Sequence, residues 1–155
     1  MNRNATMIIS PKMRKCKVDP RLYGSFVEHM GRCVYTGLFE PEHETADDRG
    51  FREDVLDLVK PLQIPIFRYP GGAYASSYYW EDSVGPIENR KKRIESCWHS
   101  IEPNTFGIDE FASWVEKNDS QIMMTINLAT RGIQDALNQL EYCNMDTNTY
   151  YAELR

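Results

Sequence analysis

Polar side chains stand at the ends of three apolar segments that are predicted to be strands. Glu28, Arg68 and Asn127 each lie where such a segment gives way to a turn or loop. Parallel strands bring their carboxyl ends to one edge of a sheet, and enzymes built this way bind ligands there. A carboxylate, a guanidinium and an amide at one edge would suit the hydroxyls of a sugar. These three residues are therefore the first candidates for a binding site.

Structural alternatives accompany the titratable candidates. For Glu28, an ion pair with Arg68 or Arg32 is as good an interpretation as contact with a ligand. His29 and His99 are candidate general bases, but a single histidine is more often a hydrogen-bonded structural residue. Both interpretations of Glu28 stay open on the sequence alone.

The segment that follows the turn Pro70–Gly72 is long, aromatic and poorly periodic. Residues 73–104 are therefore predicted to be a functional loop rather than a linker. Aromatic faces there would stack on a sugar, although local packing is favoured for any single one. Glu81 and Asp82 are adjacent carboxylates that point apart on an extended loop, which favours loop-fixing hydrogen bonds over an acid–base pair.

Strands and helices alternate along the chain, and this order positions the candidates. The strands are predicted at Met7–Ile9, Lys15–Val18, Tyr23–His29, Ile64–Phe67 and Gln121–Asn127. The last of these is nearly continuous in apolar residues, which predicts burial on both faces and a core position for Met123 and Met124. The alternation predicts an α/β fold with parallel strands and right-handed crossovers.

Apolar spacing predicts the helices between these strands. One is read from Phe51, Val55, Leu58, Val59 and Leu62, and Pro61 should end it near the preceding residue. Two others are predicted at Gly107–Lys117 and Gly132–Cys143, and a further one begins at Tyr150. The helix at 132–143 is expected to bury Ile133, Ala136, Leu137 and Leu140.

Composition narrows the classes of partner. The chain has 155 residues, enough for one domain or part of a larger one, and its net charge of −5 argues against nucleic acid. No segment approaches a membrane span, and no glycine-rich phosphate loop is present. Cysteines show no metal-binding spacing, no signal peptide is recognised, and a cytoplasmic location with reduced thiols is expected.

Several blocks of the sequence form a recognisable series: Tyr23–Tyr35, Phe67–Gly72, Trp80–Pro86, Ser100–Glu102, Phe106–Gly107, Asn127–Gly132 and Glu141–Asn144. In their order and residues they are similar to the family 51 α-L-arabinofuranosidases, and the resemblance runs from about Asp19 to the end. It implies that residues 19–155 form about three strand–helix units of an incomplete (β/α)₈ TIM barrel. It also implies that residues 1–18 supply a strand to a β-sandwich domain.

The resemblance implies a retaining glycoside hydrolase. Its substrates would be terminal non-reducing α-L-arabinofuranosyl residues of arabinan- or arabinoxylan-type oligosaccharides, cleaved without metal or cofactor. Glu28 and Arg68 match substrate-binding positions, Trp98 matches an aromatic position near the cleft, and Ala73 stands where asparagine is usual. Tyr74–Ser77 also depart from the common pattern. Members of the family often assemble as hexamers, so a homo-oligomer is expected.

The same resemblance places both catalytic glutamates beyond Arg155. No residue of this chain is therefore assigned as catalytic, and the 155 residues alone are expected to be inactive. Two alternatives remain: another (β/α)₈ glycosidase, such as an endo-glucanase-like enzyme, and a non-catalytic remnant that binds sugar.

Overall fold

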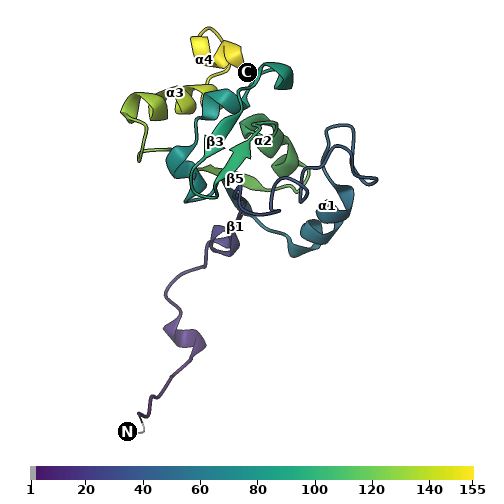
Figure 1. Cartoon of the computed structure of the whole chain (residues 1–155). Coiled ribbons are helices and arrows are strands. Elements are labelled where there is room, and N and C mark those ends of the chain that lie inside the picture. Colours follow the sequence, from purple (N-terminus) through teal and green to yellow (C-terminus); the bar gives the residue numbers. More distant parts are fainter. Residues whose placement is uncertain (1–2) are drawn as a thin grey trace.

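A parallel sheet lies at the centre of the chain, for which a computed structural model describes residues 3–155 (Figure 1). Within these residues its strand order is β1-β2-β5, with β2 in the middle. The strands are Ser25–Phe26 (β1), Ile66–Tyr69 (β2) and Gln121–Met124 (β5). Phe26 lies opposite Arg68, and Arg68 lies opposite Met123. The parallel pairing confirms the α/β class.

Helices separate the strands as the sequence predicts. The α-helices of residues 3–155 are Glu53–Val59 (α1), Ile108–Glu116 (α2), Ile133–Asn144 (α3) and Tyr150–Leu154 (α4). Short 3₁₀ turns occur at Pro11–Met13, Pro20–Tyr23, Lys60–Leu62, Tyr74–Ser77, Trp80–Ser83 and Ile87–Asn89. The α1 helix gives way to a 3₁₀ turn just before Pro61, because proline cannot continue the helical hydrogen bonds.

The main core lies between α2 and one face of the sheet. The Trp114 ring packs edge-on against Phe67 at 5.1 Å, and Phe111 stacks on Tyr69 at 4.4 Å. On the opposite face of the sheet, the side chains of Phe26 and Met123 are 54% and 50% exposed. The sheet is therefore covered by a helix on one face and open on the other.

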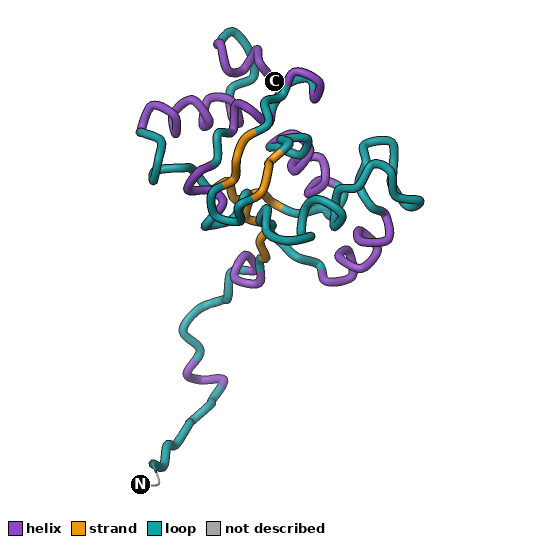
Figure 2. Tube along the Cα trace, viewed as in Figure 1, coloured by secondary structure: helices purple, strands orange, loops and turns teal. Residues whose placement is uncertain are grey.

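The described part of the N-terminal segment contains no strand, so the two strands predicted before residue 19 are wrong. Residues 3–18 run away from the body as an arm with one 3₁₀ turn (Figure 2). Ser10 begins this turn by accepting a hydrogen bond from the Lys12 N–H. Met7, Ile8 and Ile9 are exposed, because no other part of residues 3–155 pairs with them.

The α3 helix buries the face opposite to the predicted one. Ile133, Leu137 and Leu140 are 77%, 51% and 59% exposed, whereas Asp135, Gln139 and Tyr142 are buried. The exposed stripe joins α2 and β5 in lining an apolar groove of about 650 Å³. Spacing correctly identified an apolar stripe, but no described element covers it.

Two further predictions of burial are wrong, the first because of this groove. Gln121–Met124 is not buried on both faces: Ile122 is 40% exposed and lines the groove beside the half-buried Met124. In α1, Leu56 is buried and Leu58 is 74% exposed, although Leu58 was predicted to face inward.

The long segment after β2 contains a hairpin that was not predicted from the sequence. Strands Arg93–Glu95 (β3) and Ser100–Glu102 (β4) pair antiparallel, with Ile94 opposite Ile101. Both isoleucines are exposed while Glu95 and Glu102 are buried. This inverts the usual alternation, in which apolar residues point inward.

In the described residues no helix is long and apolar enough to cross a membrane.

Gly107 and Gly132 occupy the same position before α2 and α3, so the effect of alanine at the two sites can be compared directly. A β-carbon on Gly107 would lie 2.0 Å from the Ser83 carbonyl oxygen, whereas one on Gly132 would meet nothing within 4 Å. We expect Gly107→Ala to lower the free energy of unfolding by about 3 kcal/mol and Gly132→Ala by less than about 1 kcal/mol. Urea denaturation checks this, and equal losses would contradict it.

Candidate functional site

Glu28 lies just beyond the carboxyl end of β1, and backbone amides hold its carboxylate. It is 9% exposed, and its Oε1 accepts hydrogen bonds from the N–H groups of Gly72 at 3.1 Å and Tyr74 at 3.0 Å. The ion pairs of residues 3–155 do not include Glu28, so the alternative of a pair with Arg68 or Arg32 is wrong. Two amide donors hold this carboxylate, and no cation of residues 3–155 forms an ion pair with it.

The turn that carries these amides approaches Glu28 so closely that one position requires glycine. Gly71 has a φ of +112°, and a β-carbon there would lie 2.3–2.5 Å from the Cβ, Cγ and Cδ atoms of Glu28. Gly72 has open space around it. Gly71 therefore allows the Glu28 side chain to pass over the turn and reach the amides beyond it.

Arg68 points to the open face of the sheet. Strand alternation buries its neighbours Phe67 and Tyr69 on the α2 side and leaves Arg68 half-buried on the other. Its guanidinium lies 5.4 Å from the centre of the Phe26 ring. Within the described range this side chain makes no ion pair or hydrogen bond, so its donors are available to a ligand.

Asn127 has a structural role instead of a binding role. It is 4% exposed. Its Nδ2 donates to the Tyr78 carbonyl at 3.1 Å and to Thr130 Oγ1 at 2.9 Å. Its Oδ1 accepts from the N–H groups of Ala129 and Thr130, each at 3.1 Å. Both ends of the amide are thus occupied in fixing the loop after β5.

His29 is also a structural residue, which was one of the two interpretations of its place in the sequence. It is buried, its Nδ1 lies 3.0 Å from Glu102 Oε2, and its Nε2 lies 2.8 Å from the Tyr69 hydroxyl. His99 lies between β3 and β4 with an exposed side chain. The structure therefore does not bring the two histidines together.

Ala73 and Trp98 lie on neighbouring segments although they are far apart in the sequence. The Cys97 thiol donates to the Ala73 carbonyl at 3.2 Å. Buried Glu95 accepts the backbone N–H groups of Cys97 at 2.9 Å and Trp98 at 2.5 Å. The Trp98 side chain is 41% exposed. The hairpin end that bears Trp98 thus borders the turn that holds Glu28.

Most of the other aromatic side chains in residues 73–104 belong to the core. Tyr74, Tyr78 and Trp80 are at most 5% exposed. Trp80 packs against Tyr142 with ring centres 5.0 Å apart. The packing interpretation of these three residues is therefore confirmed.

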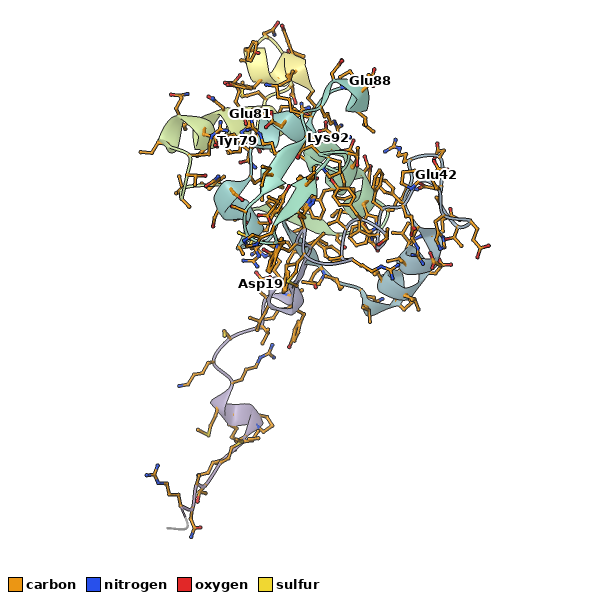
Figure 3. The ribbon with its side chains drawn as sticks, in the orientation of Figure 1. Asp19, Glu42, Tyr79, Glu81, Glu88 and Lys92 are labelled. Carbon is orange, nitrogen blue, oxygen red and sulfur yellow. The ribbon has the colours of Figure 1, made fainter. Side chains whose placement is uncertain are left out.

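Glu81 and Asp82 fix the loop through separate ion pairs, as predicted. Arg131 donates to Glu81 at 2.7 Å, and Arg93 pairs with Asp82. Both guanidinium groups lie over the Tyr79 ring, at 4.6 Å for Arg131 and 4.1 Å for Arg93. Figure 3 labels Tyr79 and Glu81 near each other in this region. These contacts join the segment after β2 to the one after β5.

Asp135 is a third carboxylate in this network, and it was not among the residues predicted from the sequence. Arg131 pairs with Asp135 as well as with Glu81. Burial, and after it the charge of Glu81, raises the pKa of Asp135 above its ordinary value.

Across the described residues, no group of three or more His, Cys, Asp or Glu side chains could hold a metal ion.

Parallel strands with a held carboxylate and an arginine at neighbouring strand ends have the arrangement with which α/β proteins bind ligands at one edge of the sheet. The family model of the alpha-L-arabinofuranosidase 1 domain matches residues 58–155. The chain therefore belongs to the α-L-arabinofuranosidases of glycoside hydrolase family 51.

Curated relatives extend this likeness over nearly the whole chain. An intracellular exo-α-(1→5)-L-arabinofuranosidase of Acetivibrio thermocellus is 51% identical over 99% of this chain and 30% of its own length. The intracellular exo-α-(1→5)-L-arabinofuranosidase 1 of Bacillus subtilis is 50% identical over 99% of this chain and 31% of its own length. The chain thus spans about 30% of the length of these relatives.

Solved structures share the conformation. A family 51 α-L-arabinofuranosidase from Bifidobacterium longum has 54% identity and a TM-score of 0.87, covering 89% of this chain and 27% of its own. An α-L-arabinofuranosidase of Thermotoga maritima, solved as an arabinose complex, has 45% identity and a TM-score of 0.84. It covers 86% of this chain and 28% of its own.

Proposed function

We propose that this chain forms the sugar-binding wall of an α-L-arabinofuranosidase. The enzyme would remove terminal non-reducing α-L-arabinofuranosyl residues from arabinan- or arabinoxylan-type oligosaccharides. The observation that carries the proposal is the buried carboxylate of Glu28, which is held by two amides and paired with no cation of residues 3–155. A carboxylate fixed in this way accepts hydrogen bonds from sugar hydroxyls through its second oxygen.

The proposed architecture is the beginning of a (β/α)₈ barrel. Residues 19–155 would supply its first strand–helix units, and the open face of the sheet with Arg68 would become the barrel interior. The groove at α3 would receive the next units. Residues 1–18 would join a β-sandwich, which is consistent with the exposed apolar side chains of Met7, Ile8 and Ile9.

In the proposed reaction, this chain binds and orients the sugar. Glu28 would accept hydrogen bonds from arabinose hydroxyls, and Arg68 would support the site and orient the catalytic carboxylates through its fork of donors. Trp98 would border the cleft, and Ala73 offers only a methyl group where the resemblance expects an amide. Retention requires an acid/base and a nucleophile about 5–5.5 Å apart. We assign both to chain regions outside these 155 residues.

The proposed location is the cytoplasm, because the Acetivibrio and Bacillus relatives are named as intracellular enzymes. A homo-oligomer, with the hexamer as the form expected from the family resemblance, is part of the same proposal. Nucleic acid and membranes are not among the proposed partners.

A hybrid enzyme tests the proposal. In it, residues 1–155 replace the matching segment of the Acetivibrio thermocellus relative, to which they are 51% identical. We expect the hybrid to release 4-nitrophenol from 4-nitrophenyl α-L-arabinofuranoside and residues 1–155 alone to release none. Glu28→Gln should lower kcat/KM of the hybrid about 10- to 100-fold, because a charge-assisted hydrogen bond to the sugar becomes a neutral one.

The control for this test is the stability of each protein. Thermal unfolding followed by circular dichroism must show that the hybrid and its Glu28→Gln variant are folded at the assay temperature. A folded hybrid without activity, or an unchanged kcat/KM in the Glu28→Gln variant, would contradict the proposed function. Turnover by residues 1–155 alone would contradict the assignment of the catalytic pair.

A further inference from the structure

The residue that follows Glu28 belongs to a buried side-chain pair, His29 and Glu102. His29, the next residue, is 8% exposed and lies 3.0 Å from Glu102 Oε2 through its Nδ1. Its Nε2 lies 2.8 Å from the Tyr69 hydroxyl. Both ring nitrogens are therefore engaged, and the orientation of the imidazole is fixed from two sides.

Glu102 anchors this pair from β4. It is 7% exposed and also accepts hydrogen bonds from the Tyr35 hydroxyl and from the Asn104 N–H at 2.8 Å. Burial alone would raise the pKa of Glu102, but these donors and His29 hold it below its ordinary value. Glu102 is thus a buried carboxylate with several donors and a fixed position.

Tyr74 links the His29–Glu102 pair to Glu28. Its ring stacks on the His29 imidazole with centres 4.3 Å apart and an interplanar angle of 10°. Its backbone N–H is one of the two donors to Glu28 Oε1, at 3.0 Å. One residue therefore contacts His29 through its side chain and Glu28 through its main chain.

We propose that His29 and Glu102 are positioning residues for Glu28 and act through Tyr74. They fix the Tyr74 ring, the ring fixes the turn, and the turn amides fix the carboxylate that receives the sugar. This inference rests on the proposed function of Glu28.

The matched variants are Tyr74→Phe and Tyr74→Leu. Phenylalanine keeps the stacked ring and removes the hydroxyl, whose pKa is raised first by burial and then by the Glu102 charge. Leucine removes the ring and keeps an apolar side chain. In the hybrid enzyme we expect Tyr74→Phe to change kcat/KM less than threefold, and Tyr74→Leu and Glu102→Gln to lower it at least tenfold.

A double-mutant cycle separates positioning from general stability. If Tyr74 acts through Glu28, Tyr74→Leu should cost less than twofold once Glu28→Gln is present. Equal costs in both backgrounds would overturn the inference and leave the proposed function standing. If Glu28→Gln alone has no effect, the proposed function fails and this inference fails with it.

A second measurement covers the case in which a hybrid variant fails to fold. In ¹H–¹⁵N spectra of residues 1–155, we expect Glu28→Gln to move the Gly72 amide proton upfield, because the bond to a charged acceptor is lost. The same substitution should move it by less than half as much in the Tyr74→Leu background. An equal shift in both backgrounds would show that the turn holds Glu28 without Tyr74 and would overturn the inference.

Discussion

Replacing Gly71 by alanine in the hybrid enzyme is expected to lower kcat/KM about 100-fold. The new β-carbon would lie 2.3 Å from Glu28 Cγ, and the backbone φ of +112° disfavours any side chain. The carboxylate must then leave its two amide donors. A displacement of about 1 Å in a substrate-positioning group is enough to cost a factor of about 100. Steady-state kinetics on 4-nitrophenyl α-L-arabinofuranoside measures the loss.

Gly72→Ala is the matched control for this prediction. The two glycines are adjacent, but a β-carbon on Gly72 meets nothing within 4 Å, and its N–H to Glu28 is retained. We expect kcat/KM of the Gly72→Ala hybrid to stay within about threefold of the parent, because its backbone has no positive φ to strain. Similar losses in the two variants would show that the close approach at Gly71 is not the cause.

Replacing Arg90 by leucine is expected to lower the free energy of unfolding of residues 1–155 by about 3–5 kcal/mol. The Arg90 side chain is 4% exposed and donates to both Glu110 oxygens, at 3.0 and 2.8 Å. It also donates to the carbonyls of Gly85 at 2.9 Å and Asn104 at 3.1 Å. Leucine would leave Glu110 and two carbonyls without this donor. Urea denaturation gives the difference.

The Arg21–Asp19 pair supplies the exposed counterpart. Their side chains are 62% and 53% exposed, although the ion-pair distance is only 2.5 Å. We expect Arg21→Ala to leave the urea midpoint of residues 1–155 unchanged, because water and salt screen an exposed pair. If Arg90→Leu and Arg21→Ala lower stability equally, burial is not the reason that the Arg90 contacts stabilise the fold.

Local sequence patterns predict where the helices and strands of this fold lie. They predict less well which face of each element is buried. The parallel order and the ends of α2 follow from residues close in sequence, such as Gly107, whose N–H donates to the Glu110 side chain at 2.8 Å. Which face of α3 is buried does not follow from the spacing of its own apolar residues. Its apolar stripe at Ile133, Leu137 and Leu140 is exposed because no described element covers it.

The candidate site divides in the same way. Glu28 and Arg68 stand out because a charged residue at the end of an apolar strand is unusual, and both remain candidates in the structure. Glu102 has no comparable local signal, since its partners His29 and Tyr35 lie 73 and 67 residues away. Asn127 has the same type of position as Glu28, but its partners Thr130 and Ala129 are local and satisfy it. Only the spatial arrangement separates these cases.

The groove lined by α2, β5 and α3 has a consequence for biosynthesis. In the Acetivibrio relative, the matching segment makes up 30% of the chain. A ribosome adds about 5–20 residues per second, so the rest of a protein of the proposed architecture emerges over tens of seconds. During that interval, in the proposed architecture, the Ile133–Leu140 stripe and the edges of β1 and β5 would lack their final partners. The nascent chain would then present an aggregation-prone surface of the kind that holdase chaperones cover.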